Sequence, residues 1–153
     1  MRTRLTSVAS LAMGFCAAAG PSPPAELDTA SEQCSSCRMA VSDPRTAAQI
    51  VSPSEEPLFF DDIGCLRNYL EGGATLPEGA VAYVADHRNN AWIEASKALY
   101  TRSDSLDTPM GSHLLAHADA ASREADPDAR EGTPLSPAEV FGPSGPPDGN
   151  RGR

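Results

Sequence analysis

Residues 47–73 read AAQIVSPSEEPLFFDDIGCLRNYLEGG, and this stretch predicts a β-hairpin followed by a helix. A short apolar run that ends at Val51 is separated by a turn containing Pro, Ser and Glu from a second run, Leu58-Phe59-Phe60. One of the next two residues, Asp61 or Asp62, can cap a helix. The helix is expected to end after Glu71, because two glycines follow it.

A similar order of elements follows along the chain. Residues 80–85 form another apolar run, residues 91–95 pair back after a polar turn, and residues 98–101 predict a further strand. We expect a helix over residues 111–124. Strand, strand, helix thus occurs first over about residues 47–71 and again over about residues 91–124, which predicts a small α+β domain of two weakly related ββα-type halves. Any small α+β domain alternates in this way, so the repeat does not establish a duplication.

The two ends of the chain differ from this central region in composition. Residues 1–19 carry two arginines, then a short apolar segment, then small residues, which is the order of an export signal or lipoprotein leader. The proline-rich residues 20–32 are expected to form a linker. Residues 126–153 contain few large apolar side chains and are expected to be a disordered tail, with one helical turn allowed near residues 136–141. The folded domain is therefore expected over residues 33–125.

The leader can end in two ways. Signal peptidase can cleave after Ala19, or Cys16 can become the lipidated residue of a bacterial lipoprotein, although Phe15 stands where a lipobox has a small residue. An unprocessed terminus is the third alternative. Both export routes place the domain outside the cytoplasm, where unprotected thiols tend to be oxidised.

Composition excludes several classes of function. The chain has 153 residues, a formal net charge of -9 and an isoelectric point of about 4.7. Such an acidic chain gains no counterion release from nucleic acid and has no electrostatic attraction to an anionic membrane. The sequence has no apolar run long enough to span a bilayer. It also has no nucleophile–base motif and no phosphate loop, so we do not expect an enzyme.

The most concentrated chemistry is in the segment Cys34-Ser35-Ser36-Cys37-Arg38-Met39. Met39 and Met110 are the two of four methionines that lie beyond the leader, and both stand beside turn residues rather than within apolar runs. Thiolates and thioethers are soft ligands that select Cu(I) over hard ions. This clustering predicts a copper(I) site formed by Cys34, Cys37, Met39 and Met110.

Cys65 and His113 are weaker candidate ligands. Cys65 lies at the edge of the apolar face of the first predicted helix, where a buried, inert cysteine is expected more than a ligand. His113 follows Met110 closely and stands four residues before His117. Two histidines at this spacing on a helix can bind a metal, but a pair that faces solvent is the commoner arrangement.

Two other interpretations of Cys34 and Cys37 stay open. A thiol-disulfide oxidoreductase would use the pair as a reversible disulfide, and it would need the pair at the start of a helix. A structural module would use the pair as a stapling disulfide, and reduction would then destabilise it. Neither interpretation requires Met39 or Met110.

Four blocks of sequence together resemble one family. They are Cys34-x-x-Cys37-x-Met39, the segment FDDIGCL at residues 60–66, the segment AWIEA at residues 91–95, and the segment TPMG at residues 108–111. In this order they are similar to the NosL family, the accessory proteins of nitrous oxide reductase. A C-x-x-C pair alone would be unspecific.

The resemblance implies a function, a location and partners. The family consists of bacterial lipoproteins that bind one Cu(I) ion in the periplasm and deliver it for assembly of the copper centres of nitrous oxide reductase. They work beside an ABC-type transporter complex, and their α+β fold has two related ββα-type halves. By motif position, Cys34, Cys37, Met39 and Met110 correspond to the copper ligands. The family commonly has Gly between the second Cys and Met, where this chain has Arg38.

Overall fold

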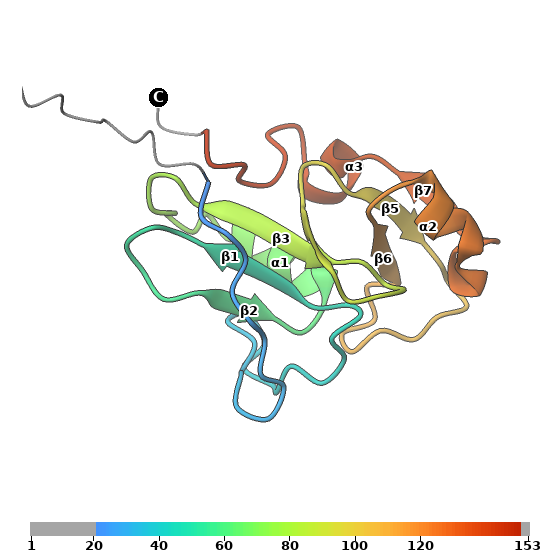
Figure 1. Cartoon of the computed structure of the whole chain (residues 1–153), viewed down its shortest axis with the longest axis horizontal. Coiled ribbons are helices and arrows are strands. Elements are labelled where there is room, and N and C mark those ends of the chain that lie inside the picture. The colour runs from blue at the N-terminus through green and yellow to red at the C-terminus, as the bar shows by residue number, and fades with distance from the viewer. Residues whose placement is uncertain (1–20, 151–153) are drawn as a thin grey trace, which may run out of the picture.

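The computed structural model describes residues 21–150, which form two antiparallel sheets and a few short helices (Figure 1). The predicted export signal, with Cys16, lies outside the described residues. The larger sheet has the strand order β2-β1-β3-β4 and consists of β1 (Ala48–Val51), β2 (Leu58–Phe60), β3 (Val81–Ala85) and β4 (Trp92–Glu94). The smaller sheet has the order β6-β5-β7 and consists of β5 (Leu99–Arg102), β6 (Leu114–His117) and β7 (Thr133–Leu135). The helices are α1 (Ile63–Glu71), α2 (Ala120–Ala125), the 3-10 turn η1 (Pro127–Ala129) and α3 (Pro137–Phe141).

The hairpin and helix predicted from residues 47–73 are confirmed. Strand β1 pairs with β2, with Gln49 opposite Phe59, and β3 joins the other edge of β1. Asp62 is the N-cap of α1, and its side chain accepts a hydrogen bond from the backbone N–H of Gly64. The chain leaves the helix through Gly73, whose φ of 75° lies in the left-handed region.

Strand β1 is buried on both faces, which explains its almost wholly apolar sequence. Ala48 and Ile50 belong to the main core, which α1 covers and which continues into the smaller sheet. Gln49 faces the other way, towards the N-terminal segment that crosses in front of the sheet (Figure 1). One core therefore joins the two sheets, and the α+β class expected from the sequence is confirmed.

The helix expected over residues 111–124 is wrong in its first half. Residues 114–117 form β6, which pairs with β5 along its whole length, and only Ala120–Ala125 are helical. Gly111 and His113 have φ values of 65° and 60°, which interrupt any helix there. All four residues of β6 are buried, and periodicity cannot distinguish so short an apolar run from a buried helix.

The expected disordered tail is also corrected. Residues 126–150 include η1, β7 and α3, and β7 pairs with β5. The ring of Phe141 packs against Tyr100 with their centroids 5.6 Å apart. A few well-placed apolar contacts and one edge pairing therefore order a segment of low overall hydrophobicity. The helical turn allowed near residues 136–141 is confirmed as α3, with a capping box between Ser136 and Glu139.

The segment expected to be a free linker is docked as well. Gln49 binds the backbone of Ala25 twice: its Oε1 accepts from the Ala25 N–H at 2.7 Å, and its Nε2 donates to the Ala25 carbonyl at 3.0 Å. The Tyr83 hydroxyl donates to the Ser22 carbonyl at 2.7 Å. A buried amide thus supplies the hydrogen bonds that the extended, proline-rich segment lacks. Within residues 21–150, no helix has the length and apolar character needed to cross a membrane.

Candidate metal centre

A tight loop positions the first two cysteines. The Cys34 N–H donates to the Met39 carbonyl at 2.8 Å, and the Arg38 N–H donates to the Cys34 carbonyl at 3.0 Å. The Ser35 N–H donates to the carbonyl of Phe59 in β2, also at 2.8 Å. The loop is therefore fastened to the strand that leads into α1.

Three thiols meet between this loop and the start of α1. The Sγ atoms of Cys34, Cys37 and Cys65 all lie within 4.8 Å of one another, and all three cysteines are free. Cys34 and Cys65 are buried, whereas Cys37 is partly exposed. Three sulfur donors at this separation form a set suited to one soft metal ion.

Cys65 was undervalued by the expectation of an inert, buried cysteine. It is buried, but it also lies in the thiol cluster because it occupies the first turn of α1, directly after the Asp62 cap. The sequence did contain a signal: Cys65 is one of only three cysteines beyond the leader, and it follows a helix cap at the end of the hairpin. Its proximity to Cys34 nevertheless depends on the long-range bond between Ser35 and Phe59.

The three thiols hold their protons unequally. Burial by itself raises the pKa of Cys34, but hydrogen bonds from the backbone N–H groups of Asp61, Cys37 and Ser36 outweigh it, so this pKa lies below its usual value. Burial raises the pKa of Cys37 and, more strongly, that of Cys65, and the negative charge of Cys34 adds to both. Cys34 is therefore the thiol of the three that most readily loses its proton to become a metal-binding thiolate.

Met110 is brought to the same end of α1 by a shared carboxylate. Asp62 accepts from the Gly64 N–H through Oδ1 at 2.6 Å and from the Met110 N–H through Oδ2 at 3.1 Å. Gly64 permits this close approach, because a Cβ there would lie 2.7 Å from the Cβ of Ser112. The loop that carries Met110 therefore lies against the helix turn that carries Cys65.

Both methionines present their side chains to solvent. Met39 is 57% exposed and Met110 is 45% exposed, and with Leu99 they are the exposed large apolar side chains of residues 21–150. Methionine commonly fills gaps in the hydrophobic core, and these two exposed side chains do not have that role. Met39 and Met110 therefore stay the candidate donors that the sequence indicated.

The histidines do not join the sulfur atoms. His113 directs its Nδ1 at the Leu106 carbonyl, 2.7 Å away, and its backbone N–H donates to Thr108. His117 lies in β6, is fully buried and belongs to a different group of side chains. The expected pairing of His113 with His117 on one side of a helix is therefore wrong.

The oxidoreductase interpretation requires a C-x-x-C pair at a helix start. Cys34 and Cys37 instead lie in a turn-rich loop closed by the bridge between Gln33 and Ala40, and the helix that begins nearby contributes Cys65. The geometry that this interpretation needs is thus not the geometry of this loop.

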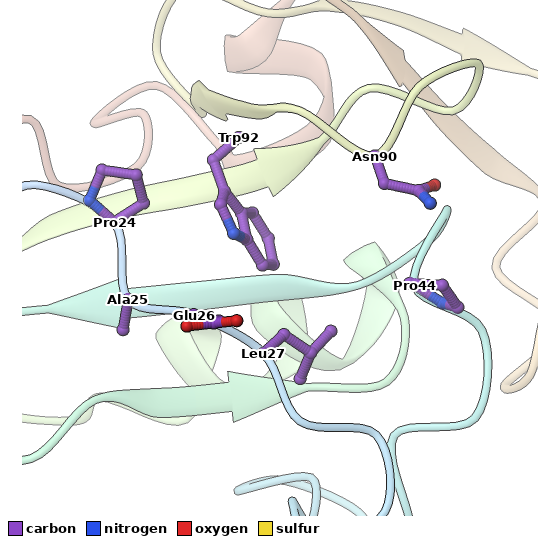
Figure 2. Close-up of a pocket in the computed structure, with 7 residues that line it drawn as sticks. All are labelled: Pro24, Ala25, Glu26, Leu27, Pro44, Asn90 and Trp92. Carbon is purple, nitrogen blue, oxygen red and sulfur yellow. The ribbon is translucent and has the colours of Figure 1, made fainter.

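A separate hollow of about 450 Å³ lies on the opposite face of the larger sheet from α1 (Figure 2). The N-terminal segment forms one wall of it, and Trp92 and Asn90 lie across from that segment. None of its lining residues offers a sulfur or imidazole donor: Pro24, Ala25, Glu26, Leu27, Pro44, Asn90 and Trp92. It is therefore not a second candidate for a soft-metal site.

Comparison with known proteins agrees with the geometry. The family model for NosL matches residues 24–140, which is well over half of the chain, so the chain belongs to the NosL family. Neither the curated proteins nor the solved structures contain a significant match. Family membership and the three-cysteine cluster together indicate a metal-binding accessory protein, with copper as the ion that the family implies.

Proposed function

We propose that this NosL-family protein binds one Cu(I) ion through Cys34, Cys37 and Cys65, with the thioethers of Met39 and Met110 on the exposed side. The observation that carries the proposal is the thiol cluster, whose three Sγ atoms lie within 4.8 Å of one another. The loops of both methionines are tied to the same place, Met39 through Cys34 and Met110 through Asp62. A donor set of thiolates and thioethers favours Cu(I) over hard ions.

The two kinds of sulfur donor have different tasks in this proposal. The three thiolates hold the ion, and they take up protons when it leaves. A thioether is neutral and can leave without a proton, so Met39 or Met110 is the donor that a partner replaces first. A cysteine, methionine or histidine of the partner then displaces the remaining donors one at a time, and the ion is never released into water.

The receiving protein in this proposal is a copper metalloenzyme outside the cytoplasm, nitrous oxide reductase in the first instance. An ABC-type transporter complex is the second proposed partner, and lipidation of Cys16 would hold the protein at the membrane. Family membership supports this assignment.

The test is an anaerobic Cu(I) titration of the mature protein against a competing chelator. We expect one tight equivalent, which Cys65→Ser weakens strongly and Met110→Leu weakens by roughly tenfold, about 1.4 kcal/mol. Leu99→Ala is the matched control for Met110, because it also removes an exposed apolar side chain but carries no sulfur. No tight equivalent in the reduced protein would overturn the proposal, and unchanged affinity in Met110→Leu would restrict the site to the cysteines.

A further inference from the structure

A second group of metal-ligating side chains lies away from the sulfur cluster. His87 follows β3, His117 ends β6, and Asp126 follows α2. Nδ1 of His87 lies 2.7 Å and Nε2 of His117 lies 2.8 Å from the same Oδ2 of Asp126. The three residues are 4%, 0% and 3% exposed, so the group is enclosed by protein.

The backbone holds these three side chains in place. The His87 N–H donates to the Ala116 carbonyl at 2.9 Å, which joins the end of β3 to β6. Asp126 caps η1 through its other oxygen, Oδ1, which accepts from the Asp128 N–H at 3.0 Å. Oδ2 is therefore left to face the two imidazoles.

The group is poorly explained as a structural network. A neutral imidazole has one N–H, and each ring can donate it to Oδ2. The remaining nitrogens, Nε2 of His87 and Nδ1 of His117, are then buried and have no hydrogen-bond partner within residues 21–150. An unpaired buried polar atom is unfavourable, and apolar side chains would fill the same space at no such cost.

The charge around the group favours a cation. Asp126 supplies one carboxylate to the group, and both imidazoles face its Oδ2. Asp86, next to His87, is also fully buried, and its carboxylate accepts hydrogen bonds from the N–H groups of Ala118 and Arg88 and from the Ser122 hydroxyl. Two carboxylates thus stand beside two imidazoles.

We propose that His87, His117 and Asp126 form a second metal site, which takes a divalent ion of the Zn²⁺ and Cu²⁺ class. Two imidazole nitrogens and one carboxylate oxygen suit such borderline ions, whereas a soft ion such as Cu(I) prefers the sulfur cluster. Ligand atoms about 2.0–2.1 Å from a tetrahedral ion lie roughly 3.3 Å apart, so each imidazole nitrogen moves about half an ångström away from Oδ2 on binding. Each ring proton moves to the other ring nitrogen, and no proton needs to be released.

This site is independent of the proposed copper function. It shares no residue and no loop with the thiol cluster, which lies between the Cys34 loop and α1. It also follows from no motif of the four sequence blocks, because His87, His117 and Asp126 all lie outside them.

Co²⁺ is the probe for the first experiment, because thiolate ligands add intense charge-transfer bands that nitrogen and oxygen ligands do not give. Titration of the full chain carrying Cys34→Ser and Cys37→Ser is expected to yield one equivalent with visible ligand-field bands and no thiolate bands, and Zn²⁺ displaces it. His117→Gln and Asp126→Asn each weaken binding by at least about 100-fold, the upper end of what loss of an outer-shell partner alone does. His113→Gln is the matched control and leaves binding unchanged, since His113 is the one of the three histidines that lies outside the proposed site.

Because a buried substitution can disturb folding, a second experiment uses the unaltered chain. Zn²⁺ is added to ¹⁵N-histidine-labelled protein, and the ring nitrogens are followed by NMR. We expect two of the three histidines to shift with saturation at one equivalent and His113 to stay constant. If neither His87 nor His117 responds, or if Co²⁺ binding is the same in His117→Gln, the proposed site does not exist and the three residues form a structural network.

Discussion

The sulfur cluster and the imidazole–carboxylate cluster are two candidate metal centres built on opposite principles. The first combines three thiols from the Cys34 loop and the first turn of α1, and two exposed methionines stand on loops tied to it. The second is enclosed and has nitrogen and oxygen donors from three places in the fold, after β3, at the end of β6 and after α2. A single small domain can therefore keep a soft, transferable ion apart from a borderline, enclosed one by donor chemistry alone.

The largest expected effect is the loss of Cu(I) binding after one substitution in the sulfur cluster, with no change at the imidazole–carboxylate cluster. Cys34→Ser removes the thiol with a lowered pKa from the cluster, and we expect it to lower Cu(I) affinity by at least about 1,000-fold, or about 4 kcal/mol. Zn²⁺ binding at His87 and His117 is expected to stay unchanged. Both are measured by competition with chelators. A parallel loss of Zn²⁺ affinity would mean that the two ions share one site.

Proton release sharpens the same comparison. Cys37 and Cys65 have raised pKa values and hold protons at neutral pH, so both protons must leave when Cu(I) binds. Apparent Cu(I) affinity is therefore expected to rise with pH below these pKa values, by up to about 100-fold per pH unit for two protons. Zn²⁺ binding at the imidazole–carboxylate cluster releases no proton, so its affinity is expected to change little around neutral pH. Titrations at three pH values with the same competitor measure both slopes, and a flat Cu(I) profile would contradict the thiol assignment.

Gly64→Ala tests whether the loop that carries Met110 contributes to Cu(I) binding at the sulfur cluster. A Cβ at Gly64 would lie 2.7 Å from the Cβ of Ser112, so the loop must move away from α1. We expect a loss of about 1–3 kcal/mol in unfolding free energy, typical of overpacking, and roughly tenfold weaker Cu(I) binding with unchanged Zn²⁺ binding.

Gly72→Ala is the control for Gly64→Ala, because its Cβ would meet carbonyl oxygens only at 3.4 Å and its φ is -66°. Denaturant unfolding and the two metal titrations are compared for both variants. Equal Cu(I) affinity in Gly64→Ala and the parent protein would place Met110 outside the copper site.

The two clusters also differ in how far the sequence predicts them. Cys34 and Cys37 can be predicted as a pair because they are three residues apart in the sequence. The hairpin and α1 can be predicted because the turn, the Asp cap and the glycine pair are also local features of the sequence. The sequence predicts that Cys65 lies on the first helix, but not that it joins the other two thiols. That depends on the hydrogen bond that fastens the Cys34 loop to β2. Local signals therefore predict a ligand, and tertiary contacts decide which other ligands reach it.

His87, His117 and Asp126 have no local signal at all. His117 looked like one half of a helical pair with His113, but β6 buries it against residues that are 30 and 9 positions away in the chain. Strand β6 was predicted as part of this helix, because four consecutive buried residues show neither the helical nor the strand periodicity. The ordered C-terminal segment was missed for a related reason: a few contacts such as Tyr100 with Phe141 outweigh its low hydrophobicity.

The smallest expected effect concerns Arg38, where this chain departs from the glycine common in the family. Arg38 has a φ of 66°, in the left-handed region that glycine adopts without strain. Arg38→Gly is expected to raise the unfolding free energy by about 0.5–1 kcal/mol, because the relief of strain exceeds the added entropy of the unfolded chain. Ser36→Gly in the same loop is the control, since Ser36 does not have a positive φ, and we expect it to lower stability by a similar amount. Thermal unfolding of both variants measures the difference. If Arg38→Gly stabilises the protein and leaves Zn²⁺ affinity unchanged, the backbone strain is confined to the Cys34 loop. If it destabilises the protein, Arg38 makes a contact in this loop that offsets its backbone strain.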